Sequence, residues 1–133
     1  MVGCAGCPVK IWLQNGLPYL TVKVSYRGRC LELHNILLDT GSAGTVFSVD
    51  KMLSIGLEYA ADDAVHRIHG VGGTEFVFSK TVGRLAIGDI HVNGFEIEVG
   101  GMNYGFEMDG IVGVDFLLRV GAIIDLAAME IRL

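Results

Sequence analysis

An apolar run in the first third of the chain ends in Asp39-Thr40-Gly41-Ser42, and this junction restricts both the fold and the chemistry. A carboxylate at the end of an apolar strand is costly to bury unless it is paired or hydrogen-bonded, so packing alone does not explain it. The hydroxyls of Thr40 and Ser42 can fix the carboxylate by hydrogen bonds, and Gly41 allows another backbone to approach closely. An Asp before a Gly is also common in turns, so the motif alone leaves open a turn residue or a catalytic acid.

The composition is that of one β-rich domain. The chain has 133 residues, which is the size of a single domain with a hydrophobic core. Its 19 glycines separate many short apolar segments, a pattern typical of all-β proteins. Apolar residues make up 51% of the chain, and we interpret this high fraction as surface that is hidden in a subunit interface.

Charge and hydropathy argue against two kinds of partner. The net charge is −5 and no run of Lys or Arg occurs, so no nucleic-acid partner is expected. No uncharged apolar stretch reaches the roughly 18 residues of a membrane span, so no membrane association is expected. The first residues lack the basic and apolar regions of a secretory signal. We therefore expect a cytoplasmic protein.

Three cysteines and two neighbouring histidines raise the question of a metal site. Cys4 and Cys7 have C-x-x-C spacing, but no second pair completes a four-cysteine site. Reduced thiols are the ordinary state of cysteines in the cytoplasm, and a zinc site that adds Cys30 or a histidine is the alternative. Residues three apart in a strand lie on opposite faces, so we interpret His66 and His69 as solvated. No metal and no cofactor are expected.

Hydropathy patterns predict the order of the elements. Residues 19–26 alternate between apolar and polar side chains, and residues 29–38 begin with alternation and end in a continuous apolar run. Ser48 can cap a short helix over residues 49–55. The other predicted segments are strands at 45–47, 64–69, 74–80, 84–87, 90–99, 110–113, 122–125 and 129–133 and a helical turn at 115–118.

Two later segments extend the Asp39 motif into a longer pattern. The glycine-rich stretch 70–73 forms the tip of a predicted hairpin, and the apolar residues and glycine of 111–113 precede Val114-Asp115-Phe116-Leu117. In this order the three segments resemble the retropepsin-like aspartic peptidases, in particular their cellular and bacterial members. The resemblance covers residues 18–133 and leaves 1–17 as an N-terminal extension. It implies an all-β, single-domain retropepsin-like acid-protease barrel, with one short helix after the catalytic loop and one near the C-terminus.

The resemblance also implies roles for individual residues. It makes Asp39 the catalytic residue and gives Thr40, Gly41 and Ser42 supporting roles, with Thr40 gripping the partner subunit. Val71 would lie at the tip of a flap over the substrate. Asp115 is interpreted as a residue that begins or caps the helix rather than as a second catalytic acid. The substrate-binding residues implied by the family are Gly41, Ala43, Gly70, Val71, Gly72, Ile111 and Val112.

The chemistry of aspartic peptidases requires two carboxylates about 3 Å apart, of which one is ionised and one is protonated. Because the chain has a single Asp-Thr-Gly, a second copy on a two-fold axis must supply the second carboxylate. The expected function is therefore an aspartic endopeptidase that acts as a homodimer on a peptide or protein substrate. A catalytically weak dimerisation or peptide-binding module with the same fold is the alternative.

Three finer expectations concern the dimer, the pH range and the substrate. The strand at 129–133 is expected to pair with the other chain, because a free edge strand tends to do so. The Ser42 hydroxyl is expected to donate to the Asp39 carboxylate, which would extend activity toward acidic pH. Apolar residues are expected beside the cleaved bond, because the predicted pocket residues are Leu37, Val46, Val71, Ile111 and Val112.

Overall fold

The structure is a computed structural model and describes residues 7–70, 73–102 and 108–133. Its strands are β1 (Val9–Lys10), β2 (Trp12–Gln14), β3 (Leu17–Tyr26), β4 (Arg29–Leu38), β5 (Val46–Ser48), β6 (Val65–Gly70), β7 (Gly73–Ile87), β8 (Ile90–Gly100), β9 (Gly110–Val112), β10 (Ile123–Asp125) and β11 (Glu130–Arg132). Its helices are α1 (Val49–Leu53) and α2 (Val114–Val120), near the C-terminus. The loop of residues 39–45 between β4 and β5, here called the Asp39 loop, precedes α1. The predicted all-β fold with two short helices is confirmed.

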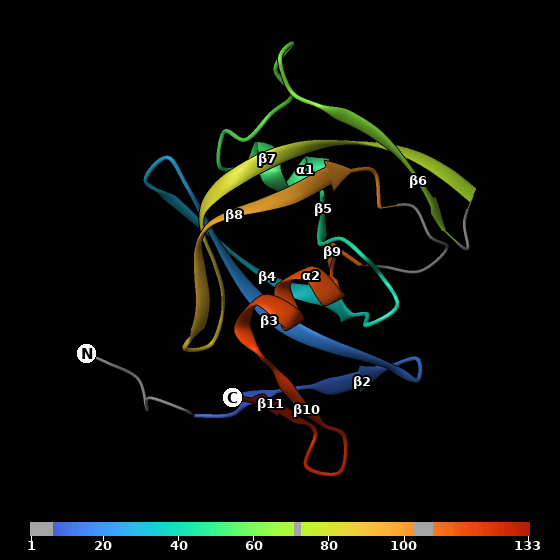
Figure 1. The fold of residues 1–133 in the computed structure, drawn as a ribbon, viewed down its shortest axis with the longest axis vertical. Coiled ribbons are helices and arrows are strands. Elements are labelled where there is room, and N and C mark those ends of the chain that lie inside the picture. Colours follow the sequence, from blue (N-terminus) through green and yellow to red (C-terminus); the bar gives the residue numbers. More distant parts are fainter. Residues whose placement is uncertain (1–6, 71–72, 103–107) are drawn as a thin grey trace.

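One large sheet forms most of the domain (Figure 1). Its eight strands follow the order β2-β3-β4-β9-β5-β8-β7-β6, and an additional β3–β7 pairing joins strands from different parts of this order. The β4–β9 and β5–β8 pairs are parallel, whereas the other pairs are antiparallel. The parallel pairs bring the segment after β4 and the segment after β9 together at one end of the sheet.

Alternation along the strands gives the central part of the sheet two faces. The main core includes Ile36, Leu38, Phe47, Val99 and Val112. The opposite face carries a smaller cluster of Tyr19, Leu37, Met108 and Ile111. Leu37 pairs with Ile111 in the β4–β9 ladder, so these two side chains share a face. Because successive residues alternate, Asp39 continues on the face of Leu37, away from the main core.

The helices begin and end at residues that the local sequence favours. The Ser48 hydroxyl accepts a hydrogen bond from the Lys51 backbone at the start of α1, as the sequence predicted. Helix α2 is longer than the single turn predicted at 115–118, and it ends at Gly121 in the left-handed conformation, with φ of 69°. Glycine adopts this conformation without steric cost, which explains why the helix stops there.

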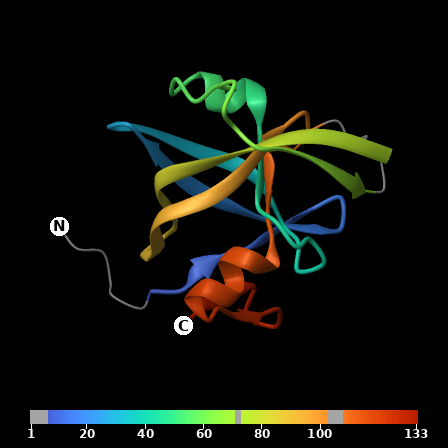
Figure 2. The same ribbon diagram turned by 45° about the horizontal axis from the view of Figure 1, so that its top comes forward.

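The two ends of the described chain form a second, three-stranded sheet. Its order is β1-β11-β10, so β11 lies in the middle and pairs with both neighbours within the same chain. The expectation that the C-terminal strand is a free edge is therefore wrong. The described part of the predicted N-terminal extension also packs into the domain, since β2 pairs with β3 and both Val9 and Ile11 are buried in the main core. This sheet lies at the opposite end of the molecule from the β6–β7 hairpin (Figure 1), and α2 lies beside it (Figure 2).

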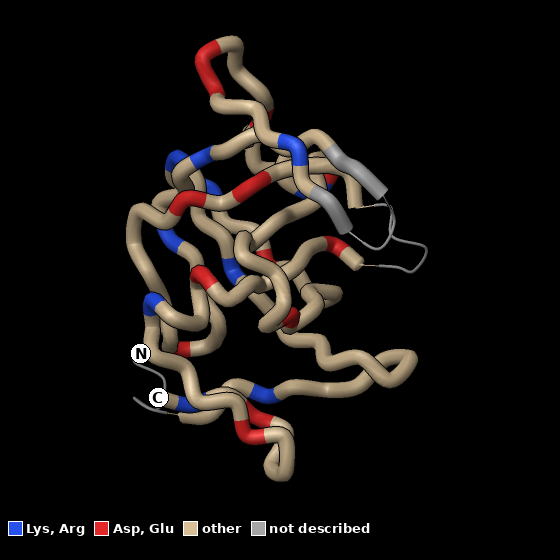
Figure 3. The backbone as a smooth tube through the Cα atoms, turned by 45° about the vertical axis from the view of Figure 1, so that its right-hand side comes forward, with Lys and Arg blue, Asp and Glu red and all other residues tan. Residues whose placement is uncertain are grey.

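Charged residues of both signs are spread over many elements of the described chain (Figure 3). Among the described residues, no helix has the length and apolar character that would let it cross a membrane. Cys7 and Cys30 are free thiols, and Cys4 lies outside the described residues. The described part of the chain also holds no group of three His, Cys, Asp or Glu side chains arranged to bind a metal ion.

Candidate active site

Asp39 lies directly after β4, where the backbone leaves the sheet. Its N–H donates to the Val112 carbonyl at 3.0 Å, which extends the β4–β9 pairing one residue beyond the strand. Its carboxylate Oδ1 accepts a hydrogen bond from the Gly41 N–H at 3.0 Å. The side chain is partly exposed. The structure therefore holds the Asp39 carboxylate in place by backbone contacts and leaves it accessible.

The residues after Asp39 form a tight loop with an exposed outer side. The Ser42 N–H donates to the Asp39 carbonyl at 3.1 Å, which closes a turn over the two residues between them. Thr40, Gly41 and Ala43, which the resemblance assigns to partner and substrate contacts, are all exposed. These three residues are therefore accessible to another molecule.

The Ser42 hydroxyl does not contact the Asp39 carboxylate. It donates instead to the Gly44 carbonyl at 2.8 Å and so stabilises the loop. The expectation that Ser42 stabilises the charged form of Asp39 is wrong. The reason is geometric, because the turn closed by the Ser42 N–H directs the side chain along the loop rather than back toward Asp39.

Replacing Ser42 with Ala is accordingly expected to leave the acidic limb of the pH–rate profile where it is. The loss of one loop hydrogen bond should lower the free energy of unfolding by about 1 kcal/mol. Peptide cleavage measured between pH 3 and 7, together with urea unfolding, checks both parts. An acidic limb that moves upward in the variant would show that the hydroxyl does reach the Asp39 carboxylate in the working enzyme.

A partly buried hydrogen-bond network joins the Asp39 loop to the start of α2. The Thr45 hydroxyl donates to Asp115 Oδ1 at 2.7 Å and accepts from the Gly113 N–H at 3.1 Å. The Thr45 N–H donates to Asp115 Oδ2 at 3.2 Å. A fourth bond runs from the Val114 N–H to the Ser42 carbonyl at 2.8 Å. The loop that carries Asp39 is thus fixed to a segment about 70 residues later in the chain.

This network corrects the interpretation of Asp115 and adds Thr45 to the site. The residue before α2 is Gly113, and no side chain caps the helix. Asp115 lies in the first turn, but its carboxylate binds Thr45 rather than the helix backbone. Thr45 is fully buried, whereas the hydropathy pattern marks it only as the start of a short strand. In the sequence, Thr45 follows two small residues and precedes two apolar ones. Nothing in this local pattern indicates that it binds Asp115.

Gly113 is required for the close approach of the two segments. A Cβ at this position would lie 2.7 Å from the Ser42 carbonyl oxygen and would collide with the Gly44 carbonyl. No real Cβ contact is that short, so only glycine fits here without a shift of the backbone.

The two apolar residues before Gly113 lie on opposite faces of β9. Ile111 belongs to the smaller cluster on the Asp39 face and is almost fully covered by its neighbours. Val112 is completely buried in the main core. The expectation that Val112 lines a substrate pocket is therefore wrong, because the alternation of the strand turns its side chain away from Asp39.

The β6–β7 hairpin contains the glycine-rich segment 70–73. The two strands pair in register up to Gly70 opposite Gly73, whereas Val71 and Gly72 lie outside the described residues. Near the base of the hairpin, His66 Nε2 lies 2.9 Å from Ser79 Oγ. His66 is thus exposed and bound to a neighbouring strand, in agreement with its interpretation as a surface histidine.

Glu98 on β8 is a residue of this region that the sequence patterns did not single out. Its Oε1 occupies the space beside Gly44, where a Cβ would collide with it. Burial raises the pKa of the Glu98 carboxyl; His66 acts in the opposite direction, and Asp115 and Glu96 raise it further. An acid whose charged form is disfavoured in this way lies directly against the loop that carries Asp39.

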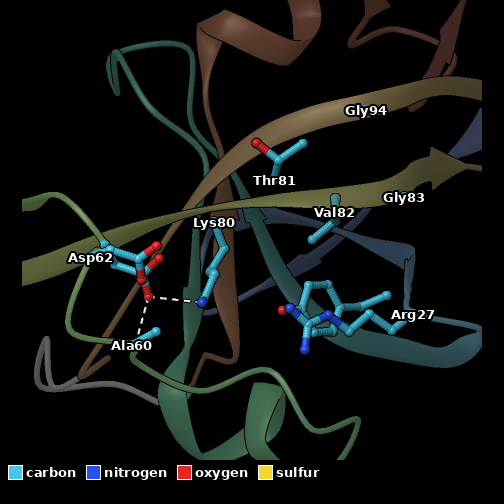
Figure 4. Close-up of a pocket in the computed structure, with 10 residues that line it drawn as sticks. Arg27, Ala60, Asp62, Lys80, Thr81, Val82, Gly83 and Gly94 are labelled. Carbon is cyan, nitrogen blue, oxygen red and sulfur yellow. Dashed lines mark hydrogen bonds and ion pairs between the residues drawn. The ribbon is translucent and has the colours of Figure 1, made fainter.

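A separate surface pocket of about 580 Å³ is lined in part by Tyr26, Asp63, Lys80 and Gly94 (Figure 4). Lys80 Nζ binds Asp63 Oδ2 at 2.8 Å, and this oxygen also accepts from the Ala60 N–H at 2.7 Å. These hydrogen bonds lower the pKa of Asp63. The ion pair ties the segment before β6 to β7. None of the lining residues belongs to the Asp39 loop, so the pocket is distinct from the candidate active site.

The fold and the site together define a class of protein. A strand followed by Asp-Thr-Gly, a neighbouring strand followed by glycine, and a hairpin between them in sequence are the parts of an acid-protease domain. The family model described as aspartyl protease matches residues 22–116, more than half of the chain. The chain therefore belongs to the retropepsin-like aspartyl protease family. Among curated proteins, a search finds none that matches it.

Proposed function

We propose that the chain is an aspartic endopeptidase whose active form is a homodimer. One observation carries this proposal: the Asp39 carboxylate is accessible, is oriented by the Gly41 N–H, and belongs to a loop fixed by four hydrogen bonds to residues 113–115. A carboxylate with only a structural role would not need an exposed position in so rigid a loop. The family match supports a protease-type function for the same residues.

The proposed reaction uses two Asp39 side chains, one from each subunit, related by the two-fold axis. The ionised carboxylate takes a proton from a water molecule as the water oxygen attacks the carbonyl carbon of the peptide bond. The protonated carboxyl donates a hydrogen bond to the carbonyl oxygen, where negative charge develops. Proton transfer to the amide nitrogen then allows the C–N bond to break, which releases a carboxylic acid and an amine.

The β6–β7 hairpin is proposed to cover the bound peptide. Its strands extend from the body of the sheet, and the sequence places three glycines at its tip. Closure over the substrate would exclude bulk water and bring backbone N–H groups to the peptide. An extended peptide would then lie as an added strand between the hairpin and the Asp39 loop, with alternate side chains directed into the protein.

The function is tested by incubating the full chain with a diverse peptide library between pH 3 and 7 and identifying the products by mass spectrometry. The expected result is cleavage at internal peptide bonds that continues in the presence of inhibitors of serine peptidases, cysteine peptidases and metallopeptidases. A chain that binds peptides in this assay without cutting any of them would instead support the peptide-binding module.

The homodimer is tested by mixing subunits. If both Asp39 side chains are needed, a mixed dimer of wild type and Asp39→Asn is inactive. An excess of about tenfold of the variant should then lower wild-type activity by about tenfold through mass action. Sedimentation velocity should show a dimer at the concentration of the assay. An active monomer, or activity that is unchanged on mixing, would contradict the dimer.

The apolar surface near the C-terminus is the region that we propose for part of the subunit contact. Leu118, Ile123, Leu126 and Leu133 are exposed by 47–74%. Within the described chain, β10 pairs only with β11, so its other edge is free to pair with a second copy. This placement replaces the contact through β11 that the sequence suggested.

A further inference from the structure

Strand pairing aligns a row of side chains on the face of the sheet that carries Asp39. Leu37 pairs with Ile111, Ile111 pairs with Val46, Val46 pairs with Glu98, and Glu98 pairs with Ser79. Directly paired residues share a face, so these five side chains lie on one side of β4, β9, β5, β8 and β7. The part of this row nearest to Asp39 is apolar, and Glu98 is its only charged member.

Glu98 is held against the Asp39 loop by its backbone and by its carboxylate. Its N–H donates to the Thr45 carbonyl at 2.9 Å, and its Oε1 fills the space beside Gly44. Thr45 and Gly44 are the residues that follow the exposed turn of the loop. The Glu98 carboxylate therefore lies beside a loop residue, Gly44, that is only a few positions after Asp39 in the sequence. Glu98 and Asp39 also share a face of the sheet.

The Glu98 carboxylate has no partner of opposite charge in hydrogen-bonding contact among the described residues. The side chain is only partly exposed. Partial burial makes the charged form of this carboxylate less favourable than it would be in open water. An apolar or amide side chain would fill the same space without this cost. The position therefore suits an acid whose partner arrives with a ligand.

We propose that Glu98 forms a subsite that selects a Lys or Arg side chain of an extended peptide bound beside Asp39. This inference rests on the proposed peptidase function and names its substrate class. An extended peptide directs every second side chain to the same face. One of these side chains can therefore reach the Asp39 end of the row while the next one on the same face reaches Glu98. A guanidinium or ammonium group would supply the missing partner.

The same subsite makes the preference depend on pH. The groups around Glu98 are His66 on β6, Asp115 on α2 and Glu96 on β8. Burial raises the pKa of Glu98, so its carboxylate is ionised above this raised pKa and becomes neutral as the pH falls through it. The preference for a basic side chain should therefore be full near neutral pH. As the pH falls, this preference should disappear at a higher pH than it would if the pKa of Glu98 were that of an ordinary glutamate.

The test compares peptides that differ at one position. A parent peptide cleaved by the chain is synthesised with Lys, Met or Glu at each position from three before to three after the cleaved bond. At one position, kcat/KM for Lys should exceed that for Met by about three- to tenfold at pH 7, and Glu should be the poorest. In Glu98→Gln the Lys-to-Met ratio should fall to about one.

The matched control is Glu96→Gln. This residue lies two positions earlier on β8, shares the face of Glu98 and is exposed, and its replacement changes the net charge equally. It should keep the Lys-to-Met ratio of the wild type. An equal loss in both variants would overturn the subsite, because it would indicate a general charge effect.

A binding experiment separates this inference from the peptidase proposal. Fluorescence anisotropy measures the affinity of labelled Lys, Met and Glu versions of one peptide for Asp39→Asn and for Asp39→Asn with Glu98→Gln. This peptide is the cleaved parent or, where the wild type cleaves none, a library peptide that the chain binds. Tighter binding of the Lys peptide that disappears in the double variant supports the subsite even if the wild type cleaves nothing. Cleavage without any preference for Lys or Arg would overturn the subsite and leave the peptidase standing. Failure of every peptide to bind would overturn the subsite as well.

Discussion

Replacing Asp39 with Asn is expected to abolish peptide cleavage without disturbing the fold. The amide has the same shape as the carboxylate, and its oxygen can still accept the hydrogen bond from the Gly41 N–H. It cannot take a proton from water, and loss of the general base should lower kcat/KM by at least about 10³-fold. Initial rates on a peptide from the library measure this loss. Circular dichroism and sedimentation show whether fold and assembly are kept.

The control for this variant is Asp50→Asn, which makes the same chemical change at an exposed residue of the first turn of α1. It should keep the parental rate. Parental activity in Asp39→Asn would contradict the catalytic role of Asp39. A folded wild type that binds peptides but cleaves none would identify the chain as a binding module that keeps the protease fold.

Replacing Thr45 with Val should cause the largest loss of stability among single changes near the site. Valine has the same shape but neither donates to Asp115 nor accepts from the Gly113 N–H. The buried Gly113 N–H would lose its hydrogen bond, and the partly buried Asp115 would keep the bond from the backbone N–H of residue 45 but lose the one from the hydroxyl, at a cost of about 1–3 kcal/mol for each lost bond. The free energy of unfolding should fall by about 2–4 kcal/mol, as measured by urea unfolding at neutral pH.

Activity should fall in the same variant, because the lost bonds position the Asp39 loop against α2. A small displacement of a catalytic group can cost about 10- to 100-fold in rate. Thr45→Ser keeps the hydroxyl and is the matched control, with a cost limited to the missing methyl group. If Thr45→Val were as stable and active as Thr45→Ser, the hydrogen-bond network would not be what holds the loop.

Local patterns in the sequence predict much of the fold. The alternation in β3 and β8 and the apolar end of β4 predict strands at nearly the correct residues, because side-chain direction in a strand depends only on the position along it. The Ser48 cap predicts the start of α1 for an equally local reason. The Asp-Thr-Gly motif predicts a loop at the end of a buried strand, and the structure places Asp39 there.

The arrangement of the terminal strands could not be predicted in this way. Residues 129–133 have the pattern of an edge strand, but a pattern does not show which other segment covers that edge. In the structure β1 and β10 take both sides of β11. The decision depends on contacts between residues more than 100 positions apart in sequence, such as Val9 opposite Ile131.

The sequence by itself therefore determined the class of fold, the position of Asp39 and the family resemblance, because each depends on short-range order along the chain. Only the tertiary structure decided how the site is held and what surrounds it. Ser42 turns to Gly44, and Thr45 binds Asp115. In the sequence, Glu98 alternates with apolar residues in the same way as Glu96, which suggests a solvated position for both. Pairing of β8 with β5 places Glu98, but not Glu96, against the Asp39 loop. The loop covers the part of β8 that carries Glu98 and leaves Glu96 exposed.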